Sequence, residues 1–86
     1  MYLEIYTPDK KVFEGEVTSA TFPGSDGTFQ VLNDHAPLIS TLGKGDIRVI
    51  KIIDKKESEN HYLVDGGVVE VLNNKVTVLA ESLPEE

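Results

Sequence analysis

Apolar and polar side chains alternate along much of this 86-residue chain with a period of two. Near its beginning, Leu3 and Ile5 alternate with Glu4 and Tyr6, and β-branched residues dominate the later apolar positions. A period of two places successive side chains on opposite faces of an extended strand, whereas an amphipathic helix repeats about every 3.6 residues. The pattern therefore predicts β-strands with one buried face. It recurs at residues 29–31, 47–52, 62–64 and 76–80, with a change of phase after residue 49.

Short groups rich in glycine, proline, asparagine and aspartate separate these runs. Such residues favour turns, and asparagine tolerates a positive φ. Short strands divided at regular spacing by turns are typical of sandwiches and barrels. We therefore predict an all-β fold, a flattened β-sandwich or barrel of short, mostly antiparallel strands. It would form a single domain of residues 1–83, followed by a short acidic tail at residues 84–86. Turns are expected at residues 7–11, 24–27, 42–46, 54–60 and 73–75, and a helical turn would fit only at residues 35–40.

The composition excludes several classes of function. The formal net charge is −7, from 15 acidic and 8 basic residues, so no basic face is available to neutralise nucleic-acid phosphates. The absence of cysteine removes disulfides, thiol catalysis and cysteine-ligated metals. No apolar run approaches the roughly 18 residues of a membrane span, and the first residues lack the pattern of a secretory signal. We therefore expect a cytoplasmic protein that neither binds nucleic acid nor inserts into a membrane.

The segment around His35 is the first candidate for chemistry. His35 directly follows Asp34, and adjacent side chains do not readily adopt the geometry of a catalytic triad. Ser25 and Ser40 are possible nucleophiles, although neither lies in a nucleophile-elbow sequence. A metal shared by His35 and His61 has no supporting spacing. We expect no catalytic residue, no metal and no cofactor. Two alternatives stay open: a β-module that binds a small molecule or a peptide, and a small hydrolase that uses His35.

Two adjacent glycines, Gly66 and Gly67, interrupt a strand-like run. Glycine within a strand usually marks a bulge or a close approach of two backbones. We interpret this pair as structural glycines at a sharp bend, where the chain crosses from one sheet to the other.

Two blocks of sequence resemble a known family. One is FPGSDGTFQVLNDHAPLISTLGKGDIRV, which begins at Phe22, and the other is YLVDGGVVEVLNNKVTVLAE, which begins at Tyr62. In this order and at this distance they are similar to the N-terminal β-sandwich domain of the epsilon subunit of bacterial F-type ATP synthase, over nearly the whole chain. The matching positions are Pro23, Gly24, Asp26, Gly27, residues 29–32, residues 35–38, Leu42, Gly45, Gly66, Gly67, Glu70, Val71, Asn74 and residues 76–81.

The resemblance implies a non-catalytic subunit of the central stalk, a rotor part that couples proton or ion transport to ATP synthesis. Such a subunit docks on the gamma subunit and on the ring of c subunits, as a peripheral protein at the cytoplasmic face of the inner membrane. The residues implied for docking on gamma are His35, Ala36, Pro37, Leu38 and Leu42. The loop implied to face the ring consists of Gly24, Ser25, Asp26, Gly27 and Thr28.

Members of this family usually continue into a C-terminal helical hairpin, which can inhibit ATP hydrolysis and in some members binds ATP. The present sequence ends at Glu86, so it is either a single-domain version or a fragment. Residues 81–86 reach at most about 20 Å when fully extended, too short for such a hairpin. We therefore expect no inhibitory latch and no ATP binding from these 86 residues.

Overall fold

A computed structural model describes residues 1–81, and within this range all regular structure is β-strand. The prediction of an all-β fold is confirmed. Residues 35–40 form no helical turn: they lead from an extended loop into a strand. The predicted domain boundary at residue 83 and the tail at 84–86 lie outside the described residues. The strands are β1 (Tyr2–Tyr6), β2 (Lys11–Glu16), β3 (Ser19–Gly24), β4 (Gly27–Leu32), β5 (Leu38–Leu42), β6 (Gly45–Ile53), β7 (Lys56–Val64), β8 (Gly67–Leu72) and β9 (Lys75–Ala80).

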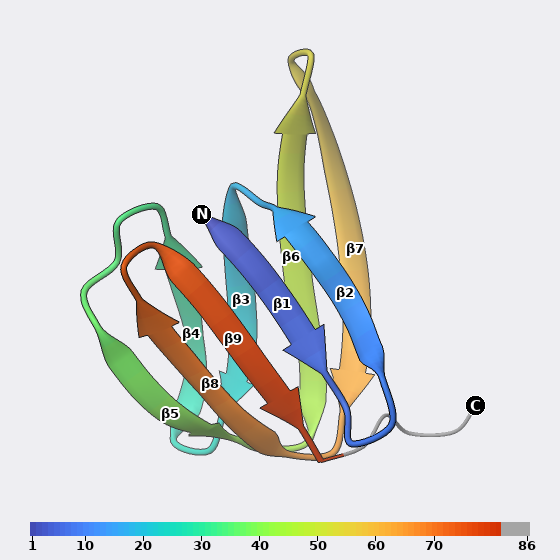
Figure 1. Ribbon diagram of the computed structural model, residues 1–86, viewed down its shortest axis with the longest axis vertical. Coiled ribbons are helices and arrows are strands. Elements are labelled where there is room, and N and C mark those ends of the chain that lie inside the picture. The colour runs from blue at the N-terminus through green and yellow to red at the C-terminus, as the bar shows by residue number, and fades with distance from the viewer. Residues whose placement is uncertain (82–86) are drawn as a thin grey trace.

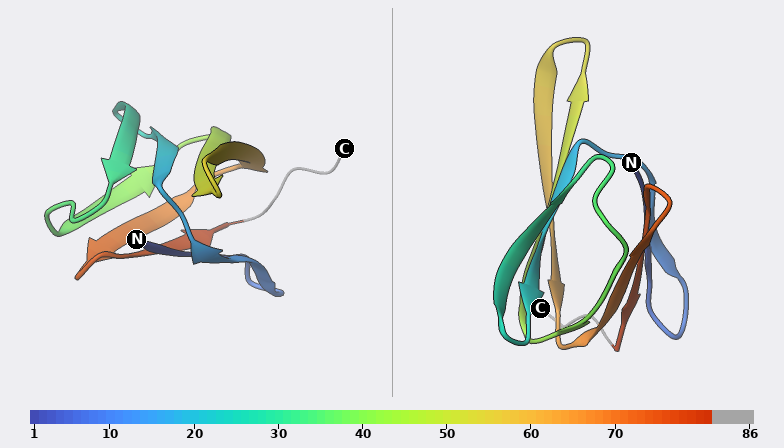
Figure 2. Two further views of the ribbon diagram at one scale, coloured as in Figure 1. Left: turned by 90° about the horizontal axis from the view of Figure 1, so that it is seen from above. Right: turned by 90° about the vertical axis from the view of Figure 1, so that its left-hand side faces the viewer.

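The strands form one sheet that curls into two layers (Figures 1 and 2). Its order is β2-β1-β9-β8-β5-β3-β6-β7, and β4 pairs with β3 outside this path. One layer contains β2, β1, β9, β8 and β5, and the other contains β4, β3, β6 and β7. The layers join at a single bridge, between Gly24 of β3 and Leu42 of β5. Every pairing is antiparallel except that of β1 with β9, as predicted for mostly antiparallel strands.

The core lies between the two layers and follows the period-two pattern. Leu3 and Ile5 point inward from β1, where their partners on β9 are Val76 and Val78. All four side chains are fully buried. A fifth, Phe22, enters from the opposite layer. The remaining fully buried side chains are Ala20, Val31, Ile47, Val49, Val64, Val69 and Val71.

Strands β2 and β7 are the two ends of the sheet, and side chains close the gap between them. The ring centroids of Phe13 on β2 and Tyr62 on β7 are 5.7 Å apart. The ammonium of Lys51 on β6 lies 4.8 Å from the Phe13 ring centroid. Tilted aromatic pairs and cation–π contacts stabilise this arrangement without backbone hydrogen bonds.

Two hairpin tips use the left-handed backbone conformation, which the sequence suggested for the paired asparagines. The turn predicted at residues 54–60 is confined to Asp54 and Lys55, because β7 begins at Lys56. Asn73 and Asn74 join β8 to β9 with φ of +51° and +61°, and Asp54 and Lys55 join β6 to β7 with φ of +51° and +65°. Two successive positive φ values match the right-handed twist of the flanking strands. The second hairpin extends beyond the rest of the sheet (Figure 1), so Ile52 is 55% exposed. In the second phase of the β6 pattern, Ile50 is still buried, and only Ile52 is exposed.

A histidine connects the two strands of this hairpin near its base. The ring of His61 on β7 lies between two carboxylates, with Nδ1 2.5 Å from Asp46 of β6 and Nε2 2.6 Å from Glu59 of β7. Asp46 first, and then Glu59, raises the pKa of His61 above its ordinary value. The charged form of the ring therefore stabilises the pairing of β6 with β7.

The two adjacent glycines lie where the chain passes from one layer to the other: Gly66 ends the connection between β7 and β8, and Gly67 is the first residue of β8. Their φ angles, +136° for Gly66 and +142° for Gly67, belong to a region that other residues rarely adopt. Their surroundings differ. A Cβ at Gly67 would lie 2.3 Å from the carbonyl oxygen of Leu79, whereas one at Gly66 would meet only the Glu81 side chain, at 3.2 Å.

We expect Gly67→Ala to destabilise the fold more than Gly66→Ala. Both changes place alanine in a strained conformation, which costs about 1–3 kcal/mol, and only the first also drives a Cβ into a neighbouring backbone. The measurement is the urea midpoint of each variant. Gly15→Ala is the control, because its Cβ would lie 3.7 Å from the nearest atom, in ordinary contact. Equal losses at Gly66 and Gly67 would contradict the assignment of the backbone contact.

The stability of the fold should depend on the charge of His61. Because its pKa is raised in the folded chain, the stabilisation is fully present below the unfolded pKa of about 6.5 and is lost as the pH rises through the folded pKa. Urea unfolding is measured at a series of pH values. As the pH rises from the unfolded pKa through the folded pKa of His61, the free energy of unfolding should fall less in His61→Gln than in wild type. His35→Gln is the matched control and should keep the wild-type profile. Identical profiles for wild type and His61→Gln would rule out a stabilising contribution from the charged His61 ring.

Candidate functional site

The outer face of β5, β8 and β9 carries four large apolar side chains that the core does not use. Ile39 is 72% exposed, Leu79 57%, Leu72 48% and Val68 39%. The strand register makes them neighbours. Val68 pairs with Leu79 across β8 and β9. Ile39 pairs with Glu70, which lies between Val68 and Leu72 on the same face of β8. Contiguous exposed apolar groups mark interaction sites more often than isolated ones do. We call this surface the β5–β8–β9 patch, and it consists of Ile39, Thr41, Val68, Glu70, Leu72, Thr77 and Leu79.

Strand β8 carries apolar side chains on both of its faces. On β8, Val69 and Val71 point into the core, while Val68 and Leu72 point outward. A half-buried strand of an antiparallel sheet normally presents polar residues to solvent. Strands that are apolar on both sides therefore indicate that something covers the outer side.

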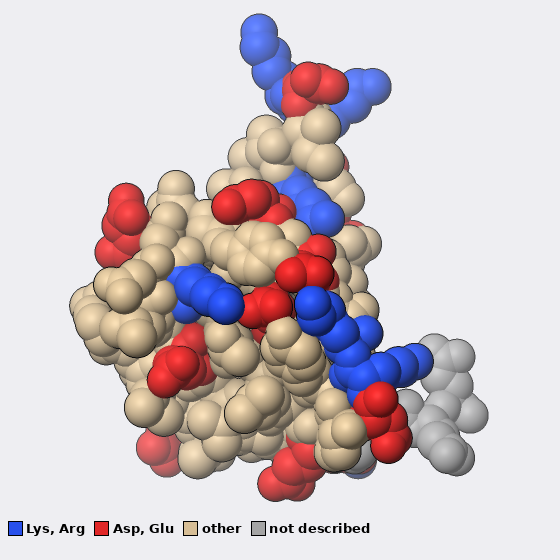
Figure 3. All heavy atoms as spheres, viewed as in Figure 1, with Lys and Arg blue, Asp and Glu red and all other residues tan. Residues whose placement is uncertain are grey.

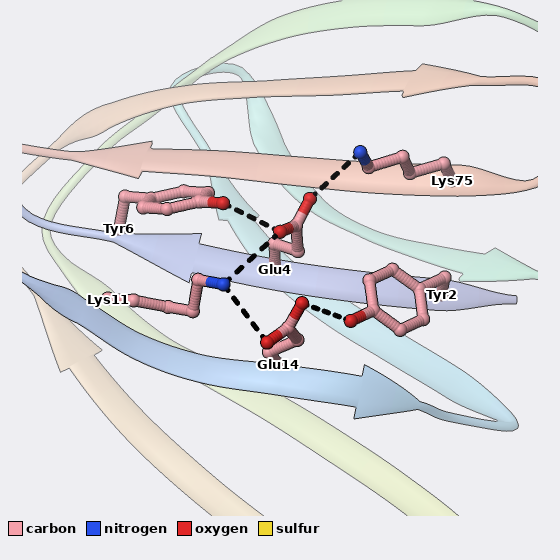
Figure 4. Close-up of polar contacts among 6 residues, drawn as sticks. All are labelled: Tyr2, Glu4, Tyr6, Lys11, Glu14 and Lys75. Carbon is pink, nitrogen blue, oxygen red and sulfur yellow. Dashed lines mark hydrogen bonds and ion pairs between the residues drawn. The ribbon is translucent and has the colours of Figure 1, made fainter.

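A polar network borders this patch on β1, β2 and β9 (Figure 4). At its centre is Glu4, whose side chain is 9% exposed. Its carboxylate accepts a hydrogen bond of 2.6 Å from the hydroxyl of Tyr6 and lies 3.0 Å from the ammonium of Lys75. Lys11 bridges Glu4, at 3.7 Å, to Glu14, at 3.0 Å. Acidic and basic side chains thus alternate over β9, β1 and β2, whereas the part over β5 and β8 is mainly uncharged (Figure 3).

The network keeps its carboxylates ionised. The hydrogen bond from Tyr6, and then the one from Lys75, lower the pKa of Glu4. Tyr2 donates a hydrogen bond to Glu14, which raises the pKa of Tyr2 to about 12. The same bond, followed by that from Lys11, lowers the pKa of Glu14. Near neutral pH this half of the face is therefore a set of fixed, mutually compensated charges.

The segment predicted to dock on gamma begins in the β4–β5 loop and continues along β5, beside the patch. The backbone amide of Asp34 donates a 2.8 Å hydrogen bond to the side chain of Asn74, which ties this loop to the β8–β9 turn. Nδ1 of His35 lies 2.7 Å from the carbonyl oxygen of Ala36. Ala36 and Pro37 are exposed, and Leu38 is half-buried against the core.

Leu42 does not belong to an accessible surface. It is 5% exposed and forms part of the core, because residues 38, 40 and 42 of β5 point inward. The outward positions of the strand are Ile39 and Thr41. The large apolar side chain that β5 exposes to solvent is therefore Ile39, which was not among the residues predicted from the sequence.

The loop predicted to face the ring is the turn between β3 and β4, at the opposite end of β5 from His35. Residues 25–28 are exposed, and Gly24 is half-buried. Two hydrogen bonds tie this turn to β5: the amide of Ser25 donates to the carbonyl of Thr41 at 3.0 Å, and the Thr41 hydroxyl donates to that of Ser25 at 2.8 Å. The two predicted docking regions thus lie at opposite ends of one strand.

The described residues offer little to the enzymatic alternative. The Ser25 and Ser40 hydroxyls bond to Thr41 rather than to the ring of His35. Among residues 1–81, no group of three or more His, Asp or Glu side chains is arranged to hold a metal ion. The same part of the chain contains no helix able to span a membrane. A shallow hollow, lined by Glu70, Leu72, Asn73, Lys75 and Thr77, opens on the outer face.

Comparisons with known proteins place these features in a family. Residues 1–85 match the sequence model of a family described as the β-sandwich domain of the ATP synthase delta/epsilon chain. The chain is 44% identical over 81 residues to the ATP synthase epsilon chain of Chlorobium limicola, covering 94% of this chain and 89% of that one. It is also 44% identical over 82 residues to the epsilon chain of Maridesulfovibrio salexigens, but spans only 54% of that relative.

Solved structures show the same fold. A chain in the central stalk and c-ring of the mitochondrial ATP synthase of Tetrahymena thermophila superposes with a TM-score of 0.79 at 19% identity, covering 98% of this chain and 65% of that one. A chain in the Euglena gracilis mitochondrial ATP synthase gives a TM-score of 0.82 at 21% identity, covering 95% and 51%. The match of the family model over nearly the whole sequence, together with the epsilon-chain relatives, identifies the chain as a member of the ATP synthase delta/epsilon chain β-sandwich family.

Proposed function

We propose that this chain is a non-catalytic subunit of the central stalk of an F-type ATP synthase, and that it couples ion transport to ATP synthesis by linking gamma to the c ring. The observation that carries the proposal is the β5–β8–β9 patch, a contiguous apolar surface that stays exposed in this member of the family. A rotor part transmits torque through its interfaces, so it needs docking surfaces and no catalytic group. The complex would hold the chain peripherally at the cytoplasmic face of the inner membrane.

In this proposal gamma covers the patch and the adjoining loop at residues 35–37. Ile39 and Leu79 supply the apolar centre of the interface, and the network around Glu4 supplies a polar rim. Such an arrangement is typical of specific protein interfaces, in which an apolar centre provides most of the affinity.

The exposed turn at residues 24–28 would face the ring. Its hydrogen bonds to Thr41 connect it directly to β5, which also carries Ile39 of the patch. A short, hydrogen-bonded strand is a stiff element. The two docking regions would therefore move together when gamma turns.

We expect Leu79→Asn to weaken binding of purified gamma by roughly tenfold or more, because an amide would be buried without a partner and the apolar contact would be lost. Calorimetry or surface plasmon resonance measures the change. Leu63→Asn is the matched control: Leu63 is equally exposed, at 57%, but lies on β7 in the other layer. Its affinity should stay near the wild-type value. Urea midpoints of both variants establish that each remains folded.

Two outcomes would contradict the proposal in different ways. If the wild-type chain fails to bind gamma and does not join the central stalk on reconstitution, the role as a rotor subunit is wrong. If gamma binds, and the loss occurs in Leu63→Asn rather than in Leu79→Asn, the chain is a stalk subunit that docks through its other face.

A further inference from the structure

Among the acidic residues on the five strands of this layer, as described within residues 1–81, Glu70 is the one whose charge no neighbour compensates. Glu4 pairs with Lys75, Glu14 with Lys11, and Glu16 with the amino group of Met1 at 3.3 Å. In the described part of the chain, neither a hydrogen bond nor an ion pair reaches the carboxylate of Glu70. It is an exposed residue in the middle of β8.

The surroundings of this carboxylate are mainly apolar. Val68 and Leu72 precede and follow it on the same face of β8, and Ile39 is its register partner on β5. On the other side its register partner is Thr77 of β9. A single charge thus lies among the apolar side chains of the β5–β8–β9 patch.

A partner that covers the apolar groups must also cover this charge. Removing an ionised carboxylate from water is strongly unfavourable unless a counter-charge or several hydrogen bonds replace the water. Ile39, Val68 and Leu72 cannot supply either. The compensating group must therefore come from the partner.

We infer that the surface which docks on this patch carries a Lys or Arg side chain that pairs with Glu70. The inference rests on the proposed function, because it takes gamma as the partner. The shallow hollow beside Glu70, lined also by Leu72, Asn73, Lys75 and Thr77, provides space for such a side chain. Lys75 does not fill this role, since its ammonium lies 3.0 Å from Glu4.

This pair would select the partner and its orientation. An apolar patch alone tolerates many surfaces, whereas a charge at its centre rejects any surface that places an acidic or apolar group there. The fixed charges around Glu4 add no such requirement, because they already compensate one another. Glu70 is thus the position at which the face discriminates between partners.

The test compares affinities of purified gamma for wild type, Glu70→Gln and Glu70→Leu at one ionic strength. The Gln variant should bind roughly 30-fold or more weakly, because the cation of gamma loses its counter-charge in a desolvated site. The Leu variant should also bind more weakly. Glu57→Gln, which removes an exposed carboxylate from β7 in the other layer, should bind normally. Each lysine and arginine of gamma is then replaced singly by alanine. One of these replacements should weaken binding to the wild-type chain but cause little further loss of affinity for Glu70→Gln.

The outcomes separate this inference from the proposed function. If Glu70→Leu binds gamma as tightly as wild type, or more tightly, the proposed ion pair is wrong, because the charge of Glu70 would then only oppose docking. If Leu79→Asn still weakens binding in that case, the proposed function stands. If wild-type chain does not bind gamma at all, the proposed function fails together with the inference.

Discussion

The register between the inward-facing rows of β1, β9 and β8 is the constraint on which the rest of the structure depends. Leu3 and Ile5 lie beside Val76 and Val78, and Val78 in turn pairs with Val69. Because side chains alternate strictly along a strand, a slip by one residue would turn this whole row toward solvent. Burial of the row therefore also fixes every outward position on the same strands.

The outer face follows from that register. Once Val69 and Val71 of β8 and Val76 and Val78 of β9 are buried, Leu72 and Leu79 must point outward. Glu4 then lies beside Lys75 across the parallel β1–β9 pair. The same face consequently holds an apolar half and a compensated polar half. Because both halves rest on the rigid sheet, a partner meets a surface that is already formed, which lowers the entropic cost of binding.

The contrast between two glutamates shows how placement decides the role of a charge. Glu4 is nearly buried and has three polar neighbours, so its charge belongs to the stable fold. Glu70 is exposed among apolar groups, so its charge matters when that surface is covered. Chemically identical side chains thus contribute to stability in one place and to recognition in the other.

The sequence by itself determined the strand content, the hairpin tips and the family, because period-two alternation, paired asparagines and the segment around His35 are local signals. Only the tertiary structure decided that Leu42 is buried and Ile39 exposed, because β5 is apolar in both phases and packing between layers chooses one of them. It also decided that Gly67, rather than Gly66, meets a neighbouring backbone. The isolation of Glu70 is likewise invisible in the sequence, since it depends on which strands lie beside β8 and on where their charges find partners.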